Sequence, residues 1–180
     1  IVEETLSSIK SEFNQAKRVG LLATSGTIHS RLFHKIFEKY GLTIIAPNKR
    51  NQEILMDAIY GRNGIKAGVT AGVPKDKILR IADTLIRDGA EIIVGGCTEI
   101  PLVINEDNLT IPFVDTLEEL AIATVKKAIE ENKNSKHFLI FKNIDNLDFL
   151  GLMSEAEVII GNSSSALVEA PYFHLPAINI

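Results

Sequence analysis

Apolar residues along the chain alternate between short continuous runs and longer stretches with helical spacing. Runs of strand length, rich in β-branched residues, lie at 18–23, 42–46, 91–95 and 111–114. Stretches whose apolar residues recur every three or four positions, as one face of a helix requires, lie at 29–40, 51–60, 74–88 and 117–130. Strands that alternate with helices in this way predict an α/β fold built on a parallel sheet.

The residues that bound the predicted helices agree with this pattern. Gly41 and Gly89 stand where a helix C-cap glycine is expected before a strand, and Pro74 suits a first helical turn. Asp115 or Thr116 can cap the last helix. The apolar stripe of that helix consists of Leu117, Leu120, Ala121, Thr124, Val125 and Ala128.

An entirely polar stretch, EENKNSK at 130–136, separates this set of elements from a second, shorter one. We therefore predict two domains, 1–132 and 133–180. The elements expected in the second domain are strands at 137–141, 157–161 and 177–180 and helices at 147–155 and 164–173. So few elements make a thin core for a free-standing domain.

Composition narrows the classes of function. The chain has 180 residues and a net charge of −4, without a Lys/Arg cluster, which argues against a nucleic-acid partner. Its one cysteine, Cys97, cannot form an internal disulfide, and no apolar run approaches the roughly 20 residues of a membrane helix. We expect a cytoplasmic protein with no membrane contact. Because it begins on Ile1 rather than Met and ends inside an apparent strand, we also expect a fragment.

The first chemical signal is GGCTEIP at 95–101, directly after an apolar strand. Cys97 therefore lies at the carboxyl end of a parallel strand, where ligands bind in open α/β sheets, and the glycines let a ligand approach the backbone closely. If Thr98 caps a short helix with Pro101 in its first turn, the helix N-terminus lowers the thiol pKa. The alternative is a buried structural cysteine, and position alone leaves both open.

Two stretches in the same order resemble the aspartate/glutamate racemase superfamily, in its aspartate racemase-like branch. GCTEIPL at 96–102 resembles the second cysteine motif, and VGLLATSGTIHS at 19–30 resembles the Gly-Thr turn that opens the second lobe. KAG at 66–68 and IPFVDT at 111–116 also fit. The resemblance covers roughly residues 1–130 and implies a three-layer, Rossmann/flavodoxin-like lobe with a parallel sheet.

The resemblance also implies roles for particular residues and no cofactor. Cys97 is one of two thiols that exchange the substrate's α-proton, and Glu99 assists or orients it. Thr98 holds the substrate carboxylate through its hydroxyl and backbone amide, while Thr24 and Thr27 bind it from the facing loop. The substrate is an amino acid, aspartate or glutamate. For Thr24 and Thr27, ordinary helix capping remains the alternative interpretation.

The chain departs from the family in one respect. The family carries its other catalytic cysteine in a Cys-Asn-Thr type motif of an N-terminal lobe, whereas this chain has a single cysteine and residues 1–5 resemble the entry to the helix between lobes. We therefore expect it not to racemise by itself. A one-cysteine relative, the arylmalonate decarboxylase type, shows that a single thiol can protonate a carbanion. Racemases of this type commonly pair, so a homo-oligomer is expected.

The second chemical signal is GNSSS at 161–165, a turn between a strand and a helix. Exposed N–H groups and serine hydroxyls at a helix start bind phosphate well, although a serine-rich N-cap without a ligand explains the pattern equally. None of the four histidines has metal-ligand spacing, so we predict no metal site.

This second region resembles the UDP-N-acetylglucosamine 2-epimerases, most densely the hydrolysing type. The motifs that carry the resemblance are FKN at 141–143, NLDFLGLM at 146–153, VIIGNSSS at 158–165, EAP at 169–171 and PAINI at 176–180. It implies a partial, glycosyltransferase-B-like nucleotide site in which Ser163, Ser164 and Ser165 hold the diphosphate of UDP and Glu169 the ribose hydroxyls. The residues that perform the epimerase chemistry belong to earlier parts of that family.

Two hypotheses of different classes follow. The first is an isomerase, a cofactor-independent racemase lobe around Cys97. The alternative is an epimerase fragment or a UDP-sugar-binding module of a cell-surface polysaccharide biosynthesis protein, which uses 163–165 and Glu169 and catalyses nothing. A natural fusion, a truncated piece of a larger bifunctional protein and a joining accident all remain open.

Overall fold

The chain divides into two compact units, Ile1–Ala128 (unit 1) and Ile129–Ile180 (unit 2), in the computed structural model. The division falls inside the last helix of the first set of elements, just ahead of the polar stretch at 130–136. The residues described are 1–137, 139, 141, 143–161 and 164–179.

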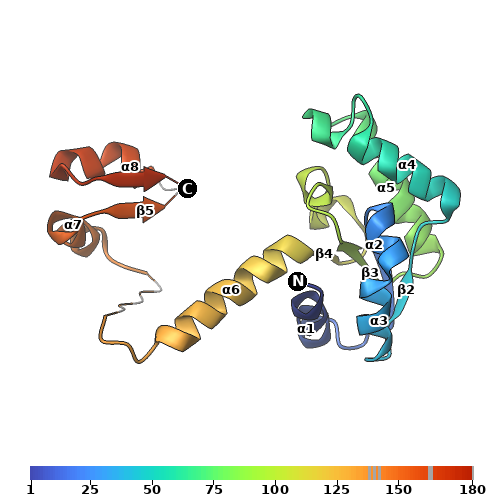
Figure 1. Ribbon diagram of the computed structural model, residues 1–180, viewed down its shortest axis with the longest axis horizontal. Coiled ribbons are helices and arrows are strands. Elements are labelled where there is room, and N and C mark those ends of the chain that lie inside the picture. The colour runs from blue at the N-terminus through green and yellow to red at the C-terminus, as the bar shows by residue number, and fades with distance from the viewer. Residues whose placement is uncertain (138, 140, 142, 162–163, 180) are drawn as a thin grey trace. The chain divides into compact units, whose positions relative to one another are not determined.

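Unit 1 is organised around a four-stranded sheet with strand order β2-β1-β3-β4 (Figure 1). Its strands are β1 (Arg18–Leu22), β2 (Thr43–Ile45), β3 (Ile92–Gly95) and β4 (Phe113–Asp115). All neighbouring strands pair in parallel. Three of the strands lie within the predicted runs and β4 extends one residue beyond its run, to Asp115, so the predicted α/β fold with a parallel sheet is confirmed.

The helices of unit 1 follow the predicted stretches with one break, except α1, for which no helical stretch was predicted. They are α1 (Val2–Glu12), α2 (Ser25–Ser30), α3 (Leu32–Glu38), α4 (Lys49–Tyr60), α5 (Val73–Arg87) and α6 (Thr116–Asn132). The single helix expected at 29–40 is wrong: Arg31 has a left-handed φ of 55°, which interrupts the helix between α2 and α3. Short 3₁₀ turns are η1 (Ile65–Ala67), η2 (Ile100–Leu102) and η3 (Glu106–Asn108).

The sheet is buried on both faces, which makes unit 1 a three-layer structure. On β3, Ile93 packs into a core formed with α4 and α5, whereas its neighbours Ile92 and Val94 pack with α1 and α3. All three are essentially inaccessible. Successive side chains of a strand point to opposite faces, so burial on both faces explains why β3 is a continuous apolar run.

The predicted helix boundaries have the expected local chemistry. Gly41 and Gly89 adopt φ angles of 77° and 98°, a conformation that favours glycine after a helix. Pro74 lies in the first turn of α5, and Asp115 Oδ1 accepts the N–H of Leu117 at 2.8 Å at the start of α6. These capping predictions are confirmed.

Helix α6 forms as predicted, but its apolar stripe is not covered by the described residues. Thr116, at its first position, is its one buried residue among them. Leu117 and Val125 are exposed, and so is Ile129 beyond the end of unit 1. Periodicity therefore predicted the helix correctly without identifying anything that packs on it.

Unit 2 contains a two-stranded parallel sheet. Its elements are α7 (Asn146–Glu155), β5 (Ile159–Gly161), α8 (Ser165–Val168), η4 (Ala170–Phe173) and β6 (Ala177–Asn179). The helix expected at 164–173 is instead a four-residue helix and a 3₁₀ turn that contains Pro171, which has no N–H to continue an α-helix. Of the strand expected at 137–141, Phe138 and Ile140 lie outside the described residues, and the others are not in a strand.

No helix in the described part of the chain combines the length and apolar character needed to cross a membrane.

Candidate functional site

The predicted site residues of unit 1 lie at the carboxyl edge of the sheet, where β1 and β3 meet. The two strands are neighbours with Leu22 opposite Gly95, and the N–H of Gly96 donates to the carbonyl of Leu22 at 2.9 Å. Thr24 and Cys97 each follow these paired residues by two positions. The helices after β1 and before β3 cover opposite faces, so this is the point where α/β sheets commonly bind ligands.

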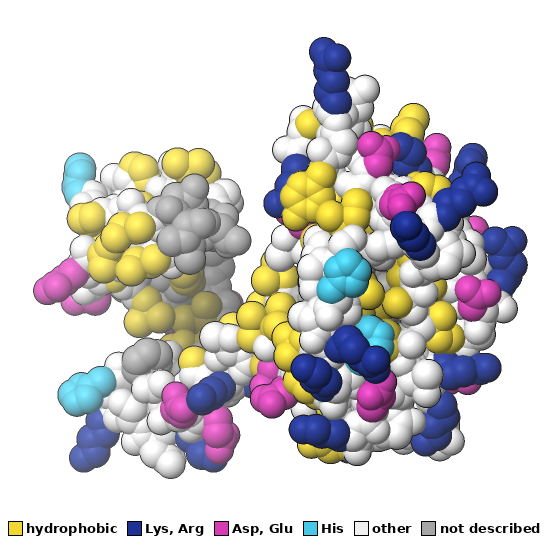
Figure 2. Space-filling view, turned by 45° about the vertical axis from the view of Figure 1, so that its right-hand side comes forward, with side chains coloured by type: hydrophobic (Ala, Val, Ile, Leu, Met, Phe, Trp, Pro, Cys, Tyr) yellow, Lys and Arg dark blue, Asp and Glu magenta, His cyan; other side chains and the backbone are white. Residues whose placement is uncertain are grey.

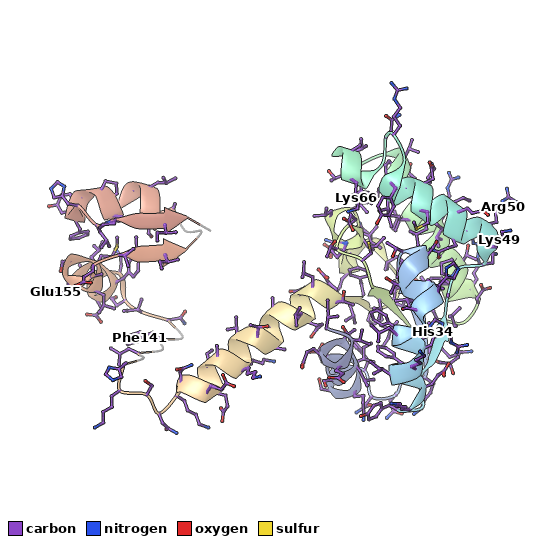
Figure 3. The ribbon with its side chains drawn as sticks, in the orientation of Figure 1. His34, Lys49, Arg50, Lys66, Phe141 and Glu155 are labelled. Atoms are coloured by element: carbon purple, nitrogen blue, oxygen red, sulfur yellow. The ribbon has the colours of Figure 1, made fainter. Side chains whose placement is uncertain are left out.

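Cys97 belongs to a chain of polar contacts that begins on η1. Its thiol donates to Glu99 Oε2, with 2.9 Å between sulfur and oxygen. The other oxygen, Glu99 Oε1, lies 2.6 Å from the ammonium of Lys66, and the Thr98 hydroxyl donates to Oε2 at 2.9 Å. Lys66 is labelled in Figure 3. Both oxygens of the carboxylate are therefore held, and the site presents a thiol rather than a free carboxylate.

These contacts shift the pKa of each group. Burial and the hydrogen bond to Glu99 raise the pKa of the Cys97 thiol from 9.0 to about 11. The thiol and the Lys66 ammonium lower the pKa of Glu99 from 4.5 to about 2, and the Glu99 carboxylate raises the pKa of Lys66. Cys97 is thus protonated at neutral pH beside an ionised carboxylate.

The predicted lowering of the Cys97 pKa by a helix N-terminus is therefore wrong. The helix expected to supply the dipole is only the three-residue turn η2. Its N-cap residue is Glu99 rather than Thr98, and the Glu99 side chain makes no capping hydrogen bond. So short a turn has little dipole to offset burial and a neighbouring negative charge.

The glycines before Cys97 serve the core rather than a ligand. A Cβ on Gly95 would lie 2.7 Å from the Phe113 ring, and a Cβ on Gly96 would lie 2.8 Å from Leu21. The space beside these glycines is filled by side chains of unit 1. The expectation that they open the backbone to a small molecule is corrected accordingly.

Thr24 and Thr27 lie at the start of α2, shortly after β1, with their hydroxyl oxygens 3.2 Å apart. Thr24 occupies the N-cap position of α2, yet its side chain makes no capping hydrogen bond. Both side chains are half-buried. The capping alternative thus loses its characteristic contact, and the two hydroxyls remain as a pair at the edge of the sheet.

Three further residues, to which the sequence assigned no role in the site, support this edge. The Gln52 amide nitrogen donates to the carbonyl of Ala23 at 2.9 Å, and Lys66 holds Glu99 as described. The buried Thr116 hydroxyl donates to the carbonyl of Gly95 at 2.9 Å. These contacts join residues distant in sequence, so helical periodicity carries no signal for them. Two of the residues lie in stretches that the family resemblance had already marked, KAG at 66–68 and IPFVDT at 111–116.

In unit 2 the predicted nucleotide site is described only in part. Ser163 lies outside the described residues, Ser164 is exposed before α8, and Ser165 begins that helix. Glu169 Oε2 is buried without a hydrogen-bond partner. Among the described residues, no group of three or more His, Cys, Asp and Glu side chains is placed to hold a metal ion.

Comparison with known proteins divides the chain in a similar way. Residues 106–180 match the UDP-N-acetylglucosamine 2-epimerase family. Over 80 residues the chain is 35% identical to the GDP/UDP-N,N'-diacetylbacillosamine 2-epimerase (hydrolyzing) of Campylobacter jejuni, which covers 37% of this chain and 21% of that protein. The resemblance of this region to the epimerases is therefore confirmed, over a small part of the relative.

Solved structures resemble unit 1. The Picrophilus torridus aspartate racemase superposes with a TM-score of 0.59 at 26% identity, over 71% of this chain and 51% of its own. An aspartate racemase homologue from Pyrococcus horikoshii OT3 gives a TM-score of 0.62 at 25% identity, over 71% and 54%. The chain thus spans about half the length of these structures.

Residues 1–124 match the family described as Asp/Glu/Hydantoin racemase. The chain is also 33% identical over 132 residues to a protein from the pnlA 3' region of Pectobacterium carotovorum subsp. carotovorum, covering 72% of this chain and 81% of that protein. Because the family match extends over most of the chain and racemase structures share the fold of that part, this protein belongs to the Asp/Glu/Hydantoin racemase family.

Proposed function

We propose that unit 1 binds an aspartate- or glutamate-type amino acid at the carboxyl edge of β1 and β3, and that Cys97 exchanges the substrate's α-proton without a cofactor. The observation that carries this proposal is the thiol of Cys97 held 2.9 Å from Glu99 at that edge. The racemase family and the racemase structures that resemble unit 1 support the same class of reaction.

Cys97 acts as an acid in the state that the structure describes. Exchange begins when the thiol loses its proton to solvent and the thiolate takes the α-proton, which breaks the C–H bond and leaves a carbanion-like α-carbon. The re-formed thiol exchanges its proton with solvent. Its S–H bond then breaks as a C–H bond forms on the same face of the α-carbon, and the thiolate stays beside Glu99. A thiolate next to a carboxylate is poorly stabilised, so it is a stronger base than an isolated thiolate and takes an α-proton in the reverse direction. Lys66 holds the Glu99 carboxylate in place and lowers its pKa, while the charge of Lys66 also acts on Cys97 and offsets part of the rise in the thiol pKa.

The three threonine hydroxyls supply the carboxylate-binding side. In this proposal Thr24 and Thr27 donate to the substrate carboxylate from the start of α2, and Thr98 donates from the turn after β3. Donors held in place before the substrate arrives stabilise the charge that develops next to the α-carbon. The Thr98 hydroxyl leaves its bond to Glu99 to do so.

One thiol serves one face of the α-carbon. The sequence contains a single cysteine, so a second thiol for the opposite face has to come from another polypeptide segment. We therefore infer that this chain exchanges the α-proton of one enantiomer with solvent and returns it to the same face, without inversion.

The proposal is tested by incubating the protein with L- or D-aspartate in D2O and following the α-proton by NMR, with a chiral assay of the same samples. We expect exchange of one enantiomer, no inversion, and loss of exchange in Cys97→Ser. Thr27→Val should weaken aspartate binding, whereas Thr43→Val, at an exposed threonine of β2, should not. Absence of exchange in the wild-type chain, or inversion as fast as exchange, would overturn the proposal.

Unit 2 supports a second candidate function, the binding of a UDP-sugar. The observation that favours it is the buried, unpartnered carboxylate oxygen of Glu169, in a region that resembles the epimerases. Titration with UDP should show binding that is lost in Glu169→Gln and kept in Glu157→Gln, at an exposed glutamate of the same unit. Equal loss in both variants, or no binding to the wild-type chain, contradicts this candidate.

A further inference from the structure

Helix α4 holds the turn that follows β1 through two side chains on one of its faces. The Gln52 amide nitrogen lies 2.9 Å from the carbonyl oxygen of Ala23 and 3.3 Å from the hydroxyl of Ser25. One helical turn further on, the sulfur of Met56 accepts the N–H of Ser25 at 3.3 Å. Residues four apart lie on the same face of a helix, so both contacts come from one side of α4.

We propose that Gln52 is a positioning residue for the carboxylate-binding turn, an inference that rests on the proposed function of unit 1. Ala23 is fully buried and is the first residue after β1, so the bond to its carbonyl fixes where the chain leaves the sheet. The bond to Ser25 fixes the residue that directly follows Thr24. Together they set the place from which the hydroxyls of Thr24 and Thr27 face the substrate.

The oxygen of the side-chain amide argues against a merely space-filling role. Gln52 Oε1 is buried and has no hydrogen-bond partner, and an unpaired buried acceptor costs free energy that an apolar side chain of similar length avoids. Turning the amide over would bring this oxygen against the carbonyl of Ala23, so the orientation is fixed by the bond to the turn. The glutamine thus leaves its own oxygen unpaired, at a cost in free energy, while its nitrogen donates to Ala23 and Ser25.

Hydrogen exchange measured by NMR tests whether Gln52 holds the turn. The two reporter amides are Ser25, which donates to Met56, and Ile28, which donates to the carbonyl of Thr24 at 3.1 Å. In Gln52→Met both should exchange on the order of 10-fold faster, while the core amides of β1 and β3 keep their rates. In Gln15→Met, the same change at an exposed glutamine, neither reporter should change. Unchanged reporters in Gln52→Met, or equal acceleration of every core amide, overturn the proposal.

A conservative variant adds a pH-dependent readout. In Gln52→Glu the protonated carboxyl group can donate to the Ala23 carbonyl, whereas the ionised form opposes it. Protection of Ser25 and Ile28 should therefore recover as the pH falls below about 4 and be lost above it. Protection that does not vary with pH contradicts the role of Gln52 as a donor.

Aspartate titrations connect this positioning to function. Affinity should fall on the order of 10-fold in Gln52→Met and stay unchanged in Gln15→Met. An affinity that Gln52→Met leaves intact overturns the positioning role. If the wild-type protein binds no aspartate, the proposed function fails, while the exchange rates still decide whether Gln52 holds the turn.

Discussion

Unit 1 and unit 2 are built from the same kinds of elements, yet they bury their apolar residues to very different extents. In unit 1 helices cover both faces of the sheet, and strand residues such as Ile93 are inaccessible. In unit 2 the buried cluster consists of Met153, Ala170 and Leu175, and the paired strand residues Ile160 and Ile178 remain 60% and 52% exposed. Figure 2 shows hydrophobic side chains on the surface of unit 2.

The difference shows that local pattern and tertiary burial are separate requirements. A parallel strand is normally covered on both faces, and two short strands with a few turns of helix cannot provide that cover. Unit 2 therefore has its elements without a core of matching size. Unit 1 has both, and the candidate catalytic thiol lies on the unit whose scaffold is fully packed.

The largest expected effect is a loss of stability in unit 1 alone, caused by a substitution in its core. Ile93→Ala removes buried methyl groups from the central sheet and should lower the unfolding free energy of unit 1 by about 2–5 kcal/mol. Met153→Ala should leave the unfolding of unit 1 unchanged. Urea unfolding followed by NMR signals from each unit measures both. A loss of stability in unit 1 caused by Met153→Ala would show that the two units unfold together.

The unfolding free energy of unit 1 should depend on pH through two groups of its site, Glu99 and Cys97. Because the folded pKa of Glu99 is about 2 rather than 4.5, its contribution is present above pH 4.5 and is lost as the pH falls toward 2. Because the folded pKa of Cys97 is about 11 rather than 9.0, its contribution is present below pH 9.0 and is lost as the pH rises toward 11. Unfolding measured across this range should therefore decline at both ends for unit 1.

Two variants separate these contributions. Glu99→Gln should reduce the decline at both ends, because it removes the carboxylate and the partner that raises the thiol pKa. Glu91→Gln removes another carboxylate whose pKa is lowered, by the backbone N–H groups of Lys17 and Arg18, and should affect the acid end alone. An alkaline decline that persists unchanged in Glu99→Gln contradicts the coupling of Cys97 to Glu99.

A smaller change concerns Lys66. Lys66→Met removes one of the two main contacts that lower the pKa of Glu99, so that pKa should rise from about 2 part of the way to its ordinary 4.5. Titration of the Glu99 carboxyl carbon by NMR reports this directly. Lys77→Met, which removes a lysine paired with Asp57, is the matched control and should leave Glu99 unchanged.

The smallest expected effect concerns α6. Val125 is 58% exposed, so Val125→Glu should change the unfolding free energy of unit 1 by less than about 0.5 kcal/mol. Ile81, on the predicted apolar face of α5, is buried, and Ile81→Glu should be severely destabilising. Equal effects of the two substitutions would mean that the stripe of α6 is covered.

Much of unit 1 could be predicted from the sequence because its signals are local. The apolar run of β3, the glycines at 41 and 89 and the acidic start of α6 act within a few residues, and each formed as expected. The stripe of α6 is also a local signal, and it correctly predicted a helix. It could not show that the described residues leave that face uncovered, because burial depends on the rest of the chain.

The sequence predicted where the candidate site lies, but not the direction in which the pKa of Cys97 shifts. The strand before Cys97 placed it at the carboxyl edge of the sheet. The direction of its pKa shift depends on burial, on Glu99 and on the absence of a full helix after it, and Glu99 in turn depends on Lys66 from another turn. Contacts between distant residues, such as Gln52 with Ala23, leave no periodic trace in the sequence.

The central claim is that burial and the contact with Glu99 together raise the pKa of the Cys97 thiol, so that the protonated, proton-donating form predominates up to about pH 11. The most direct test is titration of the Cys97 thiolate by ultraviolet absorbance in the wild-type chain and in Glu99→Gln. We predict an apparent pKa of about 11 in the wild type and a lower value, closer to 9.0, in the variant. A wild-type pKa at or below 9.0, unchanged by Glu99→Gln, would contradict the account.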